Sequence, residues 1–112
     1  MMNLFEGRTA TTQQRLQKWV PTQDLLELRR LGKSLEEMGE CVAIMARCII
    51  QGIDGADPKT GAINRVRMWQ EMADVAAQFA CTAKEFSLPR DLMMARTADK
   101  IDQMYEWEEM FK

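Results

Sequence analysis

Two short acidic segments stand out because their carboxylates are spaced three residues apart. The segment EEMGE contains Glu37 and Glu40, and the segment QEMAD contains Glu71 and Asp74. Residues three apart project from the same side of a helix. Both segments adjoin apolar residues, where carboxylates are costly to bury unless they are paired, hydrogen-bonded or bound to a metal. Four such groups facing one another would suit a hard, oxygen-seeking cation, Mg²⁺ or Mn²⁺.

The same spacing also has a purely structural explanation. Glu36 with Lys33, or Glu71 with Arg67, would form ordinary ion pairs on a solvated helix face. Two features favour the cation site: the apolar neighbours of both segments, and the closeness of the segments along the chain, which predicts that their helices pack together. The residues alone leave both explanations open.

The chain contains no histidine, and this restricts the chemistry available to it. Histidine-based catalytic triads, the usual zinc sites and the Glu-x-x-His di-iron bundle are excluded. Any catalysis must use carboxylates, Lys, Arg, Cys, Tyr or a metal ion. Cys41, Cys48 and Cys81 have no CxxC spacing, so we expect free, buried thiols.

Length and composition predict an ordinary globular protein. The 112 residues suit one domain spanning 1–112, with 46% hydrophobic and 29% charged residues. A net charge of −2 without a basic run argues against a nucleic-acid partner. The most apolar segment, CVAIMARCII, is too short to cross a membrane and contains Arg47. The first residues lack a signal-peptide pattern, so we expect a cytoplasmic protein without a membrane partner.

Helical spacing dominates the chain, and strand signals are almost absent. The pattern predicts an all-α, antiparallel four-helix bundle-like subunit with a long central helix. Thr22 is the expected N-cap of that long helix, and Gly52 its terminator. The predicted helices cover residues 12–19, 23–51, 62–86 and 89–110, and the predicted loop covers 51–64.

The long helix carries an apolar stripe that we expect to be buried. Its members recur at steps of three and four: Leu25, Leu28, Leu31, Leu35, Met38, Val42, Met45 and Ile49. A helix over 23–51 would be about 40 Å long, whereas a compact monomer of this size has a radius of gyration of about 13 Å. The stripe therefore predicts a partner subunit, in a homodimer or homotetramer.

The ordered pair of acidic motifs resembles a known family. E-E-x-x-E followed by E-x-x-D on successive helices is similar to the MazG-type all-α nucleoside triphosphate pyrophosphohydrolases, which include dimeric dUTPases, dCTP pyrophosphatases and phosphoribosyl-ATP pyrophosphohydrolases. The resemblance extends from Leu25 to Phe86, about half of the chain, and is weaker in the last helix.

The resemblance implies Mg²⁺-dependent hydrolysis of a ribo- or deoxynucleoside triphosphate between its α and β phosphates, for nucleotide pool control or house-cleaning. It also implies roles for individual residues. The implied metal ligands are Glu37, Glu40, Glu71 and Asp74, the catalytic carboxylates that orient or deprotonate water are Glu36 and Glu37, and the substrate-binding cations are Lys33, Arg47 and Lys100.

Two positions differ from the family pattern and leave the preferred base open. Arg47 stands where several pyrimidine-specific members have an aromatic residue, and Met104 stands where some members have Asn. Two other functions also stay open: a helical interaction module without catalysis, and a regulator that binds a Mg²⁺–nucleotide without turning it over.

Overall fold

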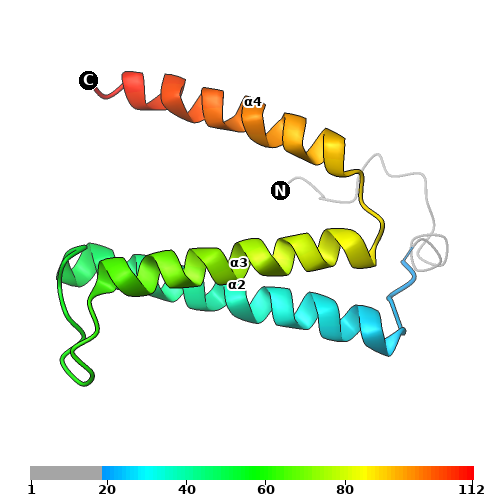
Figure 1. The fold of residues 1–112 in the computed structure, drawn as a ribbon, viewed down its shortest axis with the longest axis horizontal. Coiled ribbons are helices and arrows are strands. Elements are labelled where there is room, and N and C mark those ends of the chain that lie inside the picture. Colours follow the sequence, from blue (N-terminus) through cyan, green and yellow to red (C-terminus); the bar gives the residue numbers. More distant parts are fainter. Residues whose placement is uncertain (1–18) are drawn as a thin grey trace, which may run out of the picture.

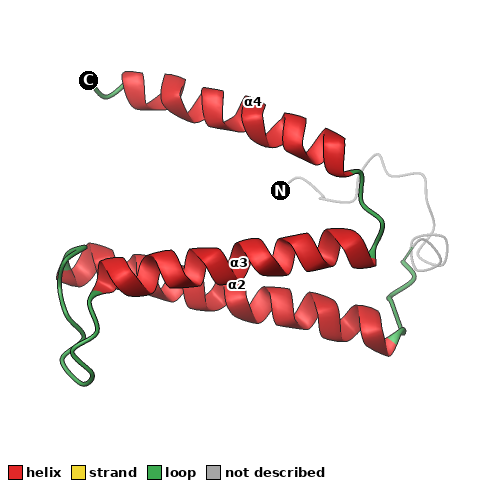
Figure 2. Ribbon diagram, viewed as in Figure 1, coloured by secondary structure: helices red, strands yellow, loops and turns green. Residues whose placement is uncertain are grey.

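The computed structural model describes residues 19–112 and contains three helices in that range (Figure 1). They are α2 (Leu25–Gln51), α3 (Asn64–Glu85) and α4 (Arg90–Glu109). This part of the chain has no strand, only one isolated bridge between Ala56 and Ile63 (Figure 2). The all-α prediction is confirmed, whereas the helix predicted over 12–19 falls almost wholly outside the described residues.

Local hydrogen bonds define both ends of the long helix, one to a side chain and one between backbone groups. Asp24, and not the predicted Thr22, is the N-cap, because its Oδ1 accepts the Glu27 backbone N–H at 3.0 Å. The Thr22 hydroxyl instead donates to the Glu27 carboxylate. Gly52 ends α2 as predicted: it adopts φ 91°, and its N–H donates to the Cys48 carbonyl at 2.9 Å. Glycine reaches that positive φ without the steric penalty of a side chain.

Helices α2 and α3 form an antiparallel hairpin, and α4 turns back beside α3 but diverges from it (Figure 1). The turn between α3 and α4 places Ser87 at φ 52°, and the Leu88 N–H donates to the Ala83 carbonyl at 2.9 Å. No residue of α4 is buried. The described residues therefore comprise one packed helix pair and one helix whose sides are open.

The contact surface between α2 and α3 is rich in polar groups. The Ser34 and Thr82 hydroxyls are hydrogen-bonded at 2.8 Å, and Arg30 Nη1 donates to Gln78 Oε1 at 3.3 Å. Ile44, only 1% exposed, is the largest fully buried apolar side chain of the described residues. Hydrogen-bonded polar pairs therefore hold the two helices together, and the contact buries few apolar side chains.

The apolar stripe of α2 is largely exposed within the described residues, so its burial against a partner subunit stays a prediction. Leu35 is 65% exposed and Ile49 is 86% exposed, whereas the side facing α3 carries Ser34, Cys41 and Ile44. Helix α3 likewise leaves large apolar residues exposed: Trp69, Met72 and Phe79. The cause is that both helices turn their polar, small-residue sides toward each other, so the apolar sides have no partner within residues 19–112.

The loop after α2 is anchored by Asn64, whose side chain has no exposed surface. Asn64 Nδ2 donates to Gln51 Oε1 and to the Gly52 carbonyl, both at 3.1 Å, and its backbone N–H donates to the Gly55 carbonyl at 2.9 Å. Through its side chain and its backbone, this one residue joins the end of α2, the loop and the start of α3, and fixes how the hairpin closes.

We expect Asn64→Ala to lower the free energy of unfolding by about 1–3 kcal/mol, because it removes two hydrogen bonds and leaves the Gly52 carbonyl with one donor fewer. Urea denaturation followed by circular dichroism measures the change. Gln70→Ala, at an exposed position of the same helix, is the control and should change stability little. Equal stability of the two variants would show that Asn64 does not anchor the loop.

Candidate metal centre

Three acidic side chains come together where α2 crosses the middle of α3. Glu37 from α2 and Glu71 and Asp74 from α3 each place a carboxylate oxygen within 4.8 Å of the others. Glu37 lies one turn from Ser34 and one turn from Cys41, on the side of α2 that faces α3. The antiparallel hairpin therefore brings together one member of the first acidic pair and both members of the second.

Two of these carboxylates have an oxygen without a hydrogen-bond partner. Glu37 Oε2 and Glu71 Oε2 are buried, and within residues 19–112 neither accepts a hydrogen bond. A buried acceptor without a partner carries a desolvation penalty, which is larger for a charged group. A divalent cation bound by these oxygens would remove both the penalty and the mutual repulsion. The donor set, all carboxylate oxygens, fits Mg²⁺ or Mn²⁺.

Glu40 lies beside this group without being one of the three mutually close ligands. The negative charges of Glu37 and then Glu71 raise the pKa of the Glu40 carboxyl above its ordinary value. Repulsion between like charges disfavours the ionised form of a carboxyl, which is the cause of this shift. Its role as a fourth ligand stays a prediction.

Lys33 offsets part of the negative charge. Its Nζ lies 3.3 Å from Glu36 Oε2 and 3.4 Å from Glu37 Oε1, on the same helix. Hydrogen bonds to Glu36 and then Glu37 raise the pKa of Lys33. Glu36 points toward solvent, in the surface ion pair that the structural explanation predicted for it. The predicted roles of Glu36 and Lys33 toward water and substrate stay predictions.

Arg47 takes part in a cluster that the sequence motifs did not reveal. Arg47 Nη1 lies 3.5 Å from Asp57 Oδ2, and Arg67 Nη1 lies 3.9 Å from the same oxygen. Backbone N–H groups of Lys59 and Thr60 donate to Asp57 Oδ1 at 2.7 and 3.3 Å. The hydrogen bond from Lys59, despite partial burial, lowers the pKa of Asp57 below its ordinary value, and the two arginines act in the same direction.

A local signal could have found Asp57. It begins the segment DPKTG, in which an Asp side chain characteristically accepts hydrogen bonds from backbone groups two and three residues later. Its pairing with Arg47 and Arg67 depends on the closed hairpin and has no equivalent signal in the sequence.

Lys100 is not brought to the acidic group in this chain. It lies on α4, where it lines a shallow depression together with Ile101, Met104 and Tyr105. The structure records no ion pair between Lys100 and any described residue. Because α4 diverges from the hairpin, the predicted contact of Lys100 with the substrate requires a different placement of α4 or a second subunit (Figure 1).

The three cysteines are free, as predicted. Cys41 is buried, but Cys48 is only partly buried and Cys81 is exposed, contrary to the expectation of buried thiols. Within residues 19–112, no helix combines the length and apolar character needed to span a bilayer.

No family model, no curated protein and no solved structure matches this chain.

We expect Mn²⁺ or Mg²⁺ to raise the thermal unfolding midpoint of the chain, because the ion binds the folded acidic group and not the unfolded chain. Differential scanning fluorimetry with increasing metal measures the shift. At saturating metal, 100-fold above the dissociation constant, the stabilisation should be about 2.7 kcal/mol.

Glu71→Gln should abolish most of this metal-dependent shift, since it replaces a buried ligand oxygen with an amide. Glu85→Gln, at an exposed position at the end of the same helix, should retain it. A shift of the same size in both variants would place the metal elsewhere.

Proposed function

We propose that this protein is a Mg²⁺-dependent nucleoside triphosphate pyrophosphohydrolase of the MazG-like all-α type. The observation that carries the proposal is the pair of buried, unpartnered oxygens on Glu37 and Glu71, which lie together with Asp74 between two antiparallel helices. This arrangement supports a cation site, and the order E-E-x-x-E then E-x-x-D supports the reaction class.

The reaction adds water across the α–β phosphoanhydride bond and releases a nucleoside monophosphate and pyrophosphate. Glu37, Glu71 and Asp74, with Glu40 beside them, are the residues that would hold the ion. Bound Mg²⁺ supplies charge neutralisation of the phosphates and a water of lowered pKa.

The remaining roles belong to side chains around the acidic group. Glu36 and Glu37 are the candidates to orient the attacking water and accept its proton. Lys33, Arg47 and Lys100 would stabilise the charge that develops on the phosphates. The proton that leaves the water reaches solvent through the carboxylate, and the bridging oxygen departs with the leaving group.

The apolar surfaces support an oligomer. Helix α4 buries none of its residues, yet it exposes large apolar side chains: Leu92, Met93, Met94, Ile101, Met104, Tyr105 and Trp107. Exposed apolar surface on this scale marks an interaction site in a folded protein. A homodimer or homotetramer would cover α4 and the apolar stripe of α2, in a cytoplasmic enzyme with no nucleic-acid partner.

Pyrophosphate release from a panel of ribo- and deoxynucleoside triphosphates tests the reaction. We expect release that requires Mg²⁺, is abolished by EDTA, and falls about 100-fold or more in Asp74→Asn, equivalent to about 2.7 kcal/mol of lost transition-state stabilisation. Asp91→Asn, on the exposed first turn of α4, is the matched control and should keep full activity.

Turnover that survives both EDTA and Asp74→Asn would refute the assignment of the acidic group. If no nucleotide is hydrolysed, tight binding of a Mg²⁺–nucleotide would favour the regulator. No binding would favour the helical interaction module.

We expect the purified protein to have a mass about two or four times the 12.9 kDa of one chain in light scattering coupled to size-exclusion chromatography. Ile101→Asp puts a charge on the apolar side of α4. This variant should shift the measured mass toward that of the monomer, because burying an unpaired carboxylate is costly. Asp99→Asn, two residues earlier at an exposed position, should leave the mass unchanged. A monomeric wild-type chain would contradict the oligomer.

A further inference from the structure

Two arginines from different helices converge on one carboxylate at the loop end of the hairpin. Arg47 from α2 and Arg67 from α3 share Asp57 Oδ2, at 3.5 and 3.9 Å. The Asp57 side chain is only 10% exposed, whereas those of Arg47 and Arg67 are 45% and 36% exposed. The carboxylate is therefore enclosed, and the two guanidinium groups remain open to solvent on their outer sides.

The charges in this cluster do not balance. Asp57 contributes one negative charge to two cations, and its other oxygen is already used by the backbone N–H groups of Lys59 and Thr60. Among residues 19–112, neither Arg47 nor Arg67 has a second carboxylate partner. Each guanidinium has five N–H donors, so the pair keeps both a positive charge and free donors.

Arg65, two residues from Arg67, shows the contrasting case. Its Nε and Nη2 donate to the two oxygens of Asp54 at 2.7 and 3.1 Å. That exposed pair is balanced one to one, as an ordinary structural ion pair is. Arg65 is thus neutralised by its own partner, whereas Arg47 and Arg67 share a single carboxylate.

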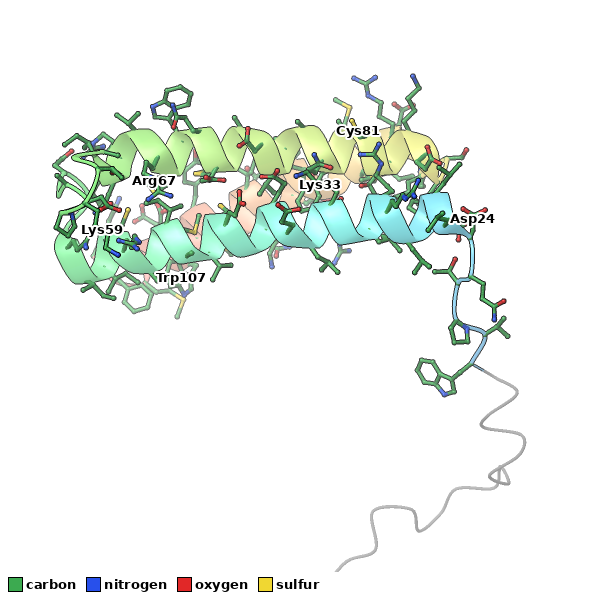
Figure 3. The ribbon with its side chains drawn as sticks, turned by 90° about the horizontal axis from the view of Figure 1, so that it is seen from below. Asp24, Lys33, Lys59, Arg67, Cys81 and Trp107 are labelled. Carbon is green, nitrogen blue, oxygen red and sulfur yellow. The ribbon has the colours of Figure 1, made fainter. Side chains whose placement is uncertain are left out.

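The arginine pair lies next to the acidic group. Arg67 is one helical turn before Glu71, on the same side of α3, and Arg47 is two turns, about 10 Å, beyond Glu40 on α2. Since the helices are antiparallel, both arginines lie on the loop side of the acids. Figure 3 shows Arg67 between the two helices near the loop, and Lys33 between them farther from the loop.

We propose that Arg47 and Arg67 form an anion site that binds the β and γ phosphates of the substrate, and that Asp57 is the positioning residue that holds both guanidinium groups in place. This inference rests on the proposed function for its substrate and adds Arg67 and Asp57 to the site. The ligand class is a phosphoanhydride, of which inorganic pyrophosphate is the smallest example.

Physical chemistry favours arginine for this task. The planar guanidinium donates two parallel N–H groups to phosphate oxygens and remains charged at every relevant pH. Two guanidinium groups held close together repel each other, and the shared carboxylate offsets that repulsion before the ligand arrives. Preorganisation of this kind lowers the entropic cost of binding.

Isothermal titration calorimetry of the full chain with inorganic pyrophosphate, with and without Mg²⁺, tests the proposal. Arg67→Gln should weaken pyrophosphate binding about tenfold or more, the size expected for a lost charge-assisted hydrogen bond. Arg65→Gln is the matched control, a lost arginine at the same end of the hairpin, and should bind within about twofold of the wild type. Arg67→Lys should bind pyrophosphate with an affinity between those of the wild type and Arg67→Gln, because lysine keeps the positive charge but lacks the parallel N–H donors of the guanidinium.

Three results would overturn the anion site: no pyrophosphate binding by the wild type, equal binding by Arg67→Gln and wild type, or equal losses in the Arg67 and Arg65 variants. If Arg67→Gln does not fold, Arg47→Gln is measured in its place under the same criteria. Asp57→Asn should also weaken binding, and an unchanged affinity would remove Asp57 as the positioning residue.

The salt dependence of binding separates a ligand contact from a structural effect. Loss of a cation that touches pyrophosphate should make affinity less sensitive to salt, whereas a merely structural loss leaves that sensitivity unchanged. Binding is measured independently of turnover. A chain that binds pyrophosphate through Arg67 but hydrolyses no nucleotide would refute the proposed function alone, and a hydrolase indifferent to Arg67→Gln in both binding and KM would refute this inference alone.

Discussion

The polar contact surface between α2 and α3 is the constraint on which the remaining structure depends. The helices contact each other through hydrogen-bonded pairs such as Ser34 with Thr82, and the contact buries very few apolar side chains. Hydrogen-bonding groups in such a contact must find partners, because an unmatched buried polar group is costly. Most of them do. Glu37 and Glu71 are the exceptions near the middle of the hairpin, because each has a buried oxygen without a hydrogen-bond partner. The folded state tolerates such an energetic cost most readily where a bound ligand removes it.

Charge changes sign along the hairpin. Lys33 lies on one side of the acidic group, and Arg67, linked to Arg47 through Asp57, lies on the loop side. An acidic centre flanked by cations is complementary to a metal ion carrying a polyphosphate, since the ion needs carboxylate oxygens and the phosphates need cationic donors. The loop contributes directly to this arrangement, because Asp57 holds the two arginines while Asn64 fixes the loop to the end of α2.

The outward surfaces of the helices have a different physical character. Apolar residues that would form a core in a compact domain are open on α2, α3 and α4. Their exposure follows from the same choice of contact surface, since a helix that turns its polar side inward leaves its apolar side outward. The hydrophobic effect then favours association of chains, and the proposed oligomer is the means by which this protein would acquire a core.

The sequence by itself determined the features that depend on nearby residues. Helical periodicity predicted α2, α3 and α4 to within about two residues at each end, Gly52 identified the end of α2, and the three-residue spacing predicted that each acidic pair shares a helix side.

The tertiary structure decided which sides meet. Periodicity shows that a helix has two unlike sides and that one of them is apolar, but it does not show that the polar side of α2 faces α3 while the apolar stripe stays exposed. Likewise, Arg47 and Arg67 each contact Asp57 from ten positions away, on opposite sides of it in the sequence. Such contacts depend on how the hairpin closes, which is set by pairing across the whole interface and not by any local pattern.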